Sequence, residues 1–142
     1  MEQKSSRNFD LLTLGQVLLR LSPPDNERLS RGDTFVKQVG GAELNVAVGA
    51  SLLGLHTGVI SKLPAHDIGS FMKGKIRSFG VSDDFFMYDH SPSARLGIYY
   101  YENGAYPRKP KVIYDRNNSS FFSLDINEIP QEVYTASKCF HT

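Results

Sequence analysis

Between residues 34 and 81 the sequence changes twice from a strand-like pattern to a helical one. The stretches 34–39 (TFVKQV) and 56–63 (HTGVISKL) are short and rich in the residues that favour strands. Each is followed by apolar residues three and four positions apart, which is the spacing of one face of a helix. Strands joined through helices usually lie parallel in one sheet, so this order predicts an α/β fold.

The ends of the two predicted helices are marked by glycine. The first apolar stripe comprises Leu44, Ala47, Val48 and Leu52, and the second comprises Ile68, Phe71, Met72, Ile76 and Phe79. Gly54 and Gly80 each precede an apolar residue, a pattern typical of helix C-termini. Asp67 is expected to cap the second helix at its N-terminus.

Three further segments complete the predicted order of elements. Residues 9–21 are apolar almost throughout and predict a buried strand that leads into a second extended segment. Residues 123–137 predict a short helix that begins near Pro130. The last residues, 138–142 (KCFHT), read as the opening of another buried strand, and we therefore expect the chain to be part of a longer protein.

Residues 94–116 differ in kind from the rest. Strand-forming residues flank Asn103-Gly104, a dipeptide that favours positive φ and commonly forms tight hairpin turns. The segment therefore predicts an antiparallel flap that stands off the parallel unit.

Composition narrows the class of function. With 142 residues and 40% hydrophobic residues, the chain can bury the core of one domain. Sixteen basic residues nearly balance fifteen acidic ones, which argues against nucleic acid or an anionic membrane as the partner. Cys139 has no disulfide partner, and no signal peptide or membrane-spanning run is recognisable, so we expect a cytoplasmic protein that binds small molecules or other proteins.

The glycine pair Gly40-Gly41 joins the strand 34–39 to the first helix. Without Cβ atoms there, the free N–H groups at the helix start are accessible and suit a polyhydroxylated or anionic ligand. Asn45, in the first turn, offers a donor and an acceptor. Alternatively, a sharp connection simply needs glycine and Asn45 caps locally. The residues alone leave both interpretations open.

The predicted hairpin is rich in tyrosine and arginine. Strand alternation places Tyr99 and Tyr101 on one face of their arm, with Arg95 nearby. It likewise places Tyr114 and Arg116 together on the other arm. Phenol and guanidinium groups would bind a sugar acid well. Such residues also stabilise hairpins by cross-strand pairing, which is the interpretation that the residues by themselves favour.

Other patterns argue against a complete catalytic set in this chain. Residues 69–75 (GSFMKGK) have the spacing of a phosphate loop, but Ile76 follows where Ser or Thr is needed, and a helical stripe runs through them. The four histidines and Cys139 show no metal-ligand spacing. Asp67 is assigned to the cap, and Asp115 is expected to pair with a basic neighbour. No nucleophile has a recognisable base partner.

Four segments in this order resemble the N-terminal half of the ribokinase-like (PfkB) carbohydrate kinases, and among these 2-keto-3-deoxygluconate kinases most of all. They are LGQVLLRLSP, VGGAELNVAVGASLLG, ISKLPAHDIGSFMKGKIRSFGV and GIYYYENGAYPRKPKVIYDRNNSS. The resemblance implies a Rossmann-like parallel sheet flanked by helices, with a protruding antiparallel β lid formed by strands from about 17–39 and 94–116. It also implies that residues 1–142 lack the C-terminal nucleotide-binding and catalytic half.

The resemblance carries substrate contacts over to six residues, namely Gly40, Gly41, Asn45, Tyr99, Tyr114 and Arg116. It implies that Arg116 binds the carboxylate of the sugar acid and that the whole enzyme uses ATP and Mg²⁺. The tyrosine-rich hairpin, with its exposed apolar surface and unpaired edge, also leads us to expect a homodimer through the lid. The function implied is phosphorylation of 2-keto-3-deoxygluconate or a similar sugar acid. A neutral-sugar kinase of the fructokinase or ribokinase type and a non-catalytic, lid-mediated dimerisation fragment remain as alternatives.

Two departures from the family pattern stand out. Gln16 follows Gly15 where related sequences commonly have glutamate. The family's G-A-G-D motif, which holds the catalytic aspartate at a helix N-terminus, does not occur in these 142 residues. We therefore expect no catalytic residue in this chain and no phosphate transfer by it alone.

Overall fold

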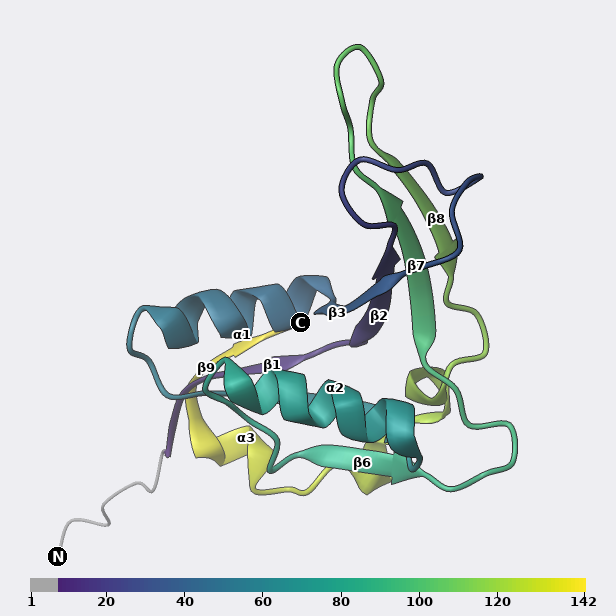
Figure 1. Ribbon diagram of the computed structural model, residues 1–142. Coiled ribbons are helices and arrows are strands. Elements are labelled where there is room, and N and C mark those ends of the chain that lie inside the picture. Colours follow the sequence, from purple (N-terminus) through teal and green to yellow (C-terminus); the bar gives the residue numbers. More distant parts are fainter. Residues whose placement is uncertain (1–7) are drawn as a thin grey trace, which may run out of the picture.

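The computed structural model describes residues 8–142, and residues 1–7, part of the stretch considered for a signal peptide, lie outside the described part. Its body is a parallel sheet with strand order β5-β4-β1-β9, and β6 also pairs in parallel with β4 (Figure 1). These strands are β1 (Phe9–Leu14), β4 (Thr57–Pro64), β5 (Val81–Ser82), β6 (Phe86–Asp89) and β9 (Ser137–His141). The predicted α/β class is confirmed.

Helices cover both faces of this sheet. On one face lie α1 (Ala42–Leu52) and α2 (Asp67–Ser78), and on the other lies the short α3 (Val133–Ala136), preceded by the 3-10 turns η1 (Ser120–Ser123) and η2 (Ile126–Glu128) (Figure 1). None of the helices among residues 8–142 is both long and apolar enough to cross a bilayer.

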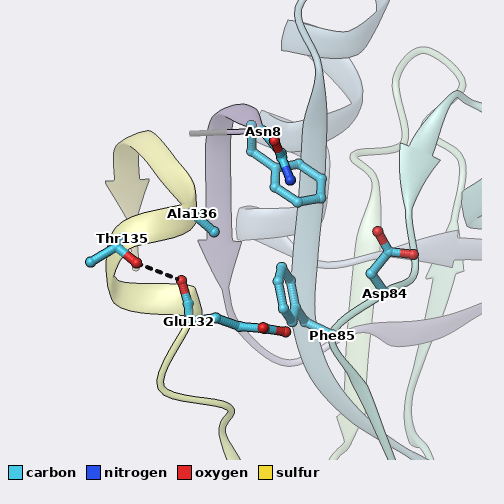
Figure 2. A pocket seen from close by; sticks show the side chains of 7 residues that line it. Asn8, Asp84, Phe85, Glu132, Thr135 and Ala136 are labelled. Atoms are coloured by element: carbon cyan, nitrogen blue, oxygen red, sulfur yellow. Dashed lines mark hydrogen bonds between the residues drawn. The ribbon is translucent and has the colours of Figure 1, made fainter. Parts of the chain in front are cut away.

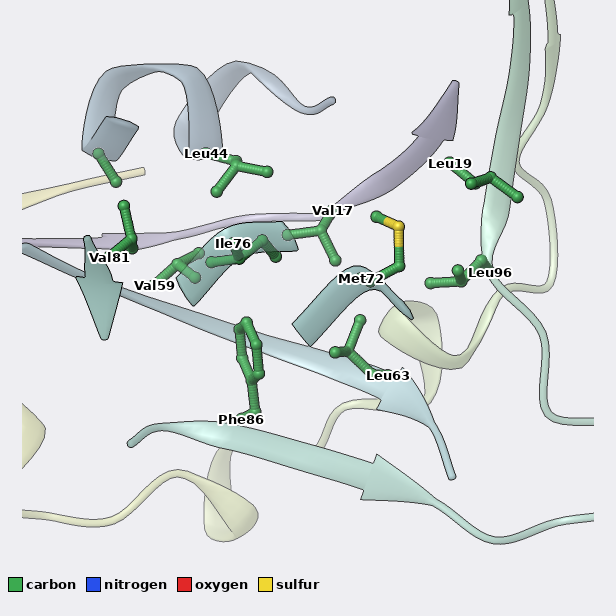
Figure 3. Close-up of a cluster of buried hydrophobic side chains, with 11 residues drawn as sticks. Val17, Leu19, Leu44, Val59, Leu63, Met72, Ile76, Val81, Phe86 and Leu96 are labelled. Carbon is green, nitrogen blue, oxygen red and sulfur yellow. The ribbon is translucent and has the colours of Figure 1, made fainter. Parts of the chain in front are cut away.

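The strand β4 is the centre of the core because all eight of its residues are buried. Its Val59 and Leu63 pack with Leu44 of α1 and Met72 of α2, as Figure 3 shows. Ile60, which points to the opposite face, packs with Val133 of α3. Burial on both faces accounts for the continuous apolar character of this segment.

The helix boundaries confirm the glycine signals and correct two details. Gly54 and Gly80 have φ of 90° and 77°, the left-handed conformation that ends helices. The N-cap of α2 is His66, whose Nδ1 accepts from the Ile68 N–H at 3.3 Å, so the expectation that Asp67 caps is wrong. Asp67 instead begins the helix, where its charge favours the dipole. Leu52 was expected in the buried stripe, but it is 74% exposed because it follows the turns that contact the sheet.

A second, four-stranded sheet has the order β3-β2-β7-β8 and projects from the body (Figure 1). Its strands are β2 (Leu18–Ser22), β3 (Val36–Gly40), β7 (Gly97–Glu102) and β8 (Lys111–Asp115). The outer pairs are antiparallel, but the central pair β2-β7 is parallel, so the expected purely antiparallel lid is wrong in this respect. Both central strands leave the body in the same direction, which makes them parallel neighbours.

The turn between β7 and β8 also differs from the predicted tight hairpin. Neither Asn103 nor Gly104 has positive φ, and the ladder stops at the pair Glu102 and Lys111. The chain reverses further on, where Ala105 and Arg108 exchange backbone hydrogen bonds of 3.0 and 2.7 Å. The ladder cannot continue through Pro110, because proline has no N–H to donate.

Candidate functional site

One side of the second sheet carries the predicted tyrosines. We call this side the tyrosine face, and its residues are Leu18, Arg20, Gln38, Gly40, Gly97, Tyr99, Tyr101, Tyr114 and Arg116. The register puts Arg20 opposite Gln38 on one side and opposite Tyr99 on the other. Tyr99 is in turn opposite Tyr114, so four polar side chains form one row across the four strands.

The aromatic side chains of this face contact one another and arginine. The rings of Tyr99 and Tyr114 have centroids 5.9 Å apart. The Arg20 guanidinium lies 4.2 Å from the centroid of the Tyr101 ring, a cation–π distance. Burial raises the pKa of Tyr99, and the nearby positive charge of Arg20 opposes that rise. Tyr99 therefore remains a neutral donor at physiological pH.

Gly40 makes room for Tyr99. A Cβ atom on Gly40 would stand 2.8 Å from Cε1 of the Tyr99 ring. Gly41 has φ of 131°, and its Cβ would stand 2.6 Å from the backbone oxygen of Gln16. The chain itself thus needs both glycines, as in the structural interpretation left open above, and the Gly41 backbone additionally faces a pocket.

This pocket, of about 330 Å³, lies where the tyrosine face meets the start of α1. The residues that line it are Leu14, Gly15, Gln16, Leu18, Gly41, Ala42, Glu43, Arg116, Phe121 and Thr142. Gly41 and Arg116, 75 positions apart in the sequence, therefore share one cavity. Leu18 and Arg116 belong to both the pocket and the tyrosine face, which makes the two continuous.

The remaining predicted residues lie beside this pocket and do not line it. Gly40, Tyr99 and Tyr114 belong to the adjoining tyrosine face, where Tyr114 is 61% exposed. Asn45 is exposed on α1, and its backbone N–H donates to the Gly41 oxygen at 2.9 Å as in any first turn. The structure thus groups five of the six predicted residues on one surface and leaves Asn45 on the adjoining helix.

Arg95 is not part of the tyrosine face. Its Nη2 lies 2.9 Å from Oδ2 of Asp115, which confirms the expected pairing of this aspartate with a basic neighbour. The same nitrogen also donates to the Asp115 carbonyl at 3.4 Å. Arg116 and Arg20 are thus the guanidinium groups of the tyrosine face.

Sequence reasoning missed two residues of this region. Arg20 was overlooked because its strand read as apolar, although the alternation of Leu18, Arg20 and Ser22 places these side chains on one face. Gln16 was noted only as a departure from a family pattern. Its burial and its place in the pocket arise from the packing of Ser119 against it, which no local pattern indicates.

A second cavity, also of about 330 Å³, lies at the other end of the body (Figure 2). Its lining residues are Asn8, Phe9, Asp84, Phe85, Glu132, Thr135 and Ala136. None of the predicted site residues lines it. Asp84 and Glu132 give it acidic character, which does not suit an anionic ligand.

Residues 8–142 contain neither a free phosphate loop at 69–75 nor a group of metal-ligating side chains. Residues 69–75 lie inside α2, so their amides are engaged in the helix and cannot bind phosphate, as the sequence predicted. Residues 8–142 contain no group of three His, Cys, Asp or Glu side chains that could hold a metal ion. The pocket combines the guanidinium of Arg116 with the carboxylate of Glu43 and the Gly41 backbone, groups that can bind both an acid group and hydroxyl groups of a small polar ligand.

Comparison with known proteins decides the family. The model of the pfkB family of carbohydrate kinases matches residues 8–140. The chain belongs to this family. The match covers the whole tyrosine face and every lining residue of the pocket except Thr142, and it confirms the resemblance inferred from the four sequence segments.

Relatives in the pfkB family act on several deoxy-keto sugar acids, to judge from their names. The chain is 35% identical over 133 residues to a 2-dehydro-3-deoxygalactonokinase from Haloferax volcanii and 31% identical over 136 residues to a 5-dehydro-2-deoxygluconokinase from Clostridium botulinum. The crystal structure of a 2-dehydro-3-deoxygluconokinase from Thermotoga maritima superimposes with a TM-score of 0.87 at 36% identity, covering 94% of this chain.

The pfkB relatives are much longer than this chain. The matched region is 94% and 95% of this chain but 41% and 40% of the two kinases from Haloferax and Clostridium. It is likewise 40% of the Thermotoga protein. The chain therefore spans about two fifths of the length of these relatives.

Proposed function

We propose that this chain is the N-terminal, sugar-binding part of an ATP-dependent kinase that phosphorylates 2-keto-3-deoxygluconate or a similar sugar acid. The observation that carries the proposal is the pocket shared by Gly41 and Arg116, which continues into a face with tyrosine hydroxyls and a second guanidinium. The names of the 30–36% identical relatives support a keto sugar acid as the substrate.

Residues of the pocket and of the surface beside it have separate roles in this proposal. Arg116 pairs with the carboxylate of the sugar acid, because guanidinium binds carboxylate in a two-point geometry. The phenol groups of Tyr99 and Tyr114 and the amide of Asn45 bond to hydroxyl or keto oxygens. Backbone groups at Gly41 contact the sugar where no side chain intervenes. By the family resemblance, the catalytic base and most of the ATP and Mg²⁺ site would belong to the C-terminal half of the enzyme; the G-A-G-D motif does not occur in this sequence, and residues 8–142 group no three metal-ligating side chains.

The proposal includes location in the cytoplasm. Cys139 is an exposed free thiol, which suits a reducing compartment.

The test is a substrate panel on the purified full-length gene product. Initial rates with ATP and Mg²⁺ would be measured for 2-keto-3-deoxygluconate, 2-keto-3-deoxygalactonate, fructose and ribose. We expect kcat/KM to be highest for one of the two acids. A higher value for fructose or ribose would instead establish the neutral-sugar alternative.

The variant Arg116→Met tests the acid-specific role of Arg116. Loss of a charge-assisted hydrogen bond is expected to raise KM for the acid by a factor of about 10 to 100. Arg28→Met, which removes an exposed arginine from the connection between β2 and β3, is the matched control. Wild-type KM for the acid in Arg116→Met would disprove the assignment.

A second proposal is that the second sheet mediates dimerisation. Apolar side chains are exposed on its edge strands, where Val36 is 48% and Ile113 is 44% exposed. Unpaired strand edges with such residues favour association. Light scattering of the full-length product should give twice the monomer mass. The variant Ile113→Glu should give a lower mass, closer to that of the monomer. A monomer at high concentration would rule out this role.

A further inference from the structure

Gln16 occupies the connection between the two sheets. It lies between the end of β1 and the start of β2, is 6% exposed and lines the pocket together with Gly41 and Arg116. A Cβ atom on Gly97 would stand 2.6 Å from Nε2 of Gln16, so Gly97 leaves space for this amide. The position of the Gln16 side chain is thus determined by its neighbours.

One end of the Gln16 amide is bonded and the other is not. Nε2 donates to the Ser119 hydroxyl oxygen at 2.6 Å, and Ser119 is itself 3% exposed. Oε1 is buried without a hydrogen-bond partner among residues 8–142. If the amide were turned over, Ser119 would donate to Oε1 and the NH₂ group would lack the partner instead. In either orientation one buried polar atom of Gln16 has no hydrogen-bond partner among residues 8–142.

An unpartnered buried amide destabilises a fold unless a ligand or water binds it. Leucine has nearly the same size and would pack between Gly97 and Leu18 without this cost. The amide is therefore better explained by something that enters the pocket than by packing.

We propose that the free amide atom of Gln16 bonds directly to the bound sugar acid, at an oxygen next to the carboxylate held by Arg116. This inference rests on the proposed function and adds a specificity-determining residue to it. A neutral amide can donate to or accept from an anionic ligand without charge repulsion. Ser119 acts as a positioning residue, because its hydroxyl holds the other end of the amide.

The experiment compares Gln16→Leu and Gln16→Asn in the full-length gene product, with Gln131→Leu as the control for loss of an exposed glutamine. For Gln16→Leu we expect KM for the acid to rise about tenfold while kcat changes less than threefold, as the loss of one bond to bound substrate requires.

Thermal unfolding with and without 2-keto-3-deoxygluconate gives a second readout. The acid should raise Tm of wild type and Gln131→Leu, and raise it less in Gln16→Leu and Gln16→Asn. Gln16→Asn keeps the amide but shortens its side chain by one methylene. This variant replaces Gln16→Leu in the test if Gln16→Leu does not fold. Wild-type KM and an undiminished Tm shift in the folded Gln16 variants would overturn the inference.

The two proposals fail in distinguishable ways. If the wild-type panel shows fructose or ribose as the better substrate, the sugar-acid function is wrong. KM of Gln16→Leu for that neutral sugar then still decides whether Gln16 contacts the ligand. If the acid is the substrate and only the Gln16 variants behave as wild type, the function stands and the contact is disproved.

Discussion

The phenol ring of Tyr99 occupies the space directly beside the α-carbon of Gly40, with Cε1 only 2.8 Å from the place where a Cβ would stand. This contact joins β7 to β3 across the intervening strand β2. The Tyr99 side chain therefore explains why residue 40 is glycine. The same contact fixes the position of the backbone before α1 relative to the tyrosine face.

Gly40→Ala should displace Tyr99 and so reduce both stability and ligand binding. We expect a loss of about 1–3 kcal/mol in the free energy of unfolding, typical of overpacking. KM for the substrate should rise as well, because Tyr99 moves. Gly49→Ala is the control, since its Cβ would meet nothing within 4 Å on α1, and it should stabilise by about 0.5–1 kcal/mol. Urea unfolding measures the stability of both variants. Equal changes in the two would contradict this prediction.

Arg20→Met should weaken binding of acidic ligands in particular. The variant removes the charge beside Tyr99 and the contact with the Tyr101 ring, and the latter is worth about 0.5–1 kcal/mol of stability. Isothermal titration with 2-keto-3-deoxygluconate should show a severalfold rise in Kd, and Arg28→Met should leave Kd unchanged. An unchanged Kd in Arg20→Met would show that the ligand does not approach this row.

Glu128→Gln should destabilise the body more than Lys62→Met. Nζ of Lys62 lies 2.8 Å from both carboxylate oxygens of Glu128, and the lysine side chain is 10% exposed against 38% for the glutamate. Glu128→Gln removes the carboxylate charge and leaves the buried ammonium with neutral acceptors, the glutamine oxygen and the Ser123 carbonyl at 3.2 Å, at a cost of about 1–3 kcal/mol. Removing the lysine leaves a carboxylate that water can reach. Urea unfolding at pH 7 measures the loss of stability in each variant. A larger loss in Lys62→Met than in Glu128→Gln would contradict this prediction.

The pair Asp89 and Ser120 should contribute to acid sensitivity. The hydrogen bond from the Ser120 hydroxyl, at 2.7 Å, and a second from the Ser91 N–H lower the pKa of Asp89. Because the folded pKa is depressed, the stabilisation is present above about pH 4, the unfolded value, and is lost as the pH falls through the folded pKa. Ser120→Ala should therefore lose less stability than wild type between pH 5 and pH 3. If the urea midpoints of wild type and Ser120→Ala fell in parallel between pH 5 and pH 3, this prediction would be wrong.

Much of the body could be predicted from local patterns. The period of the apolar residues identified α1 and α2, and their glycine stops followed from the conformational freedom that glycine alone has at positive φ. The strand β6 was missed because its four residues, FMYD, show no clear alternation. Their pairing with β4 depends on a neighbour that is distant in the sequence.

The candidate site was predictable in its residues but not in its geometry. Residue chemistry and family resemblance singled out Gly41 and Arg116, yet the cavity they share exists only because Gly41, before α1, and Arg116, after β8, come together beside the start of β2. The turn at Asn103-Gly104 was predicted wrongly, since Asn103 donates to the backbone of Asp25 at 2.9 Å in a neighbouring loop. Such contacts override a local turn preference.

The sequence by itself determined the α/β class, the helices α1 and α2, the buried strands β1 and β4 and the family, because these depend on periodicity and on motifs within short stretches of chain. The tertiary structure alone decided that β2 and β7 run parallel, that Gly40 accommodates Tyr99 and that Gln16 has a free amide atom in a pocket. These features arise from contacts between residues up to 103 positions apart. Such contacts depend on how whole strands pack, which no local pattern encodes.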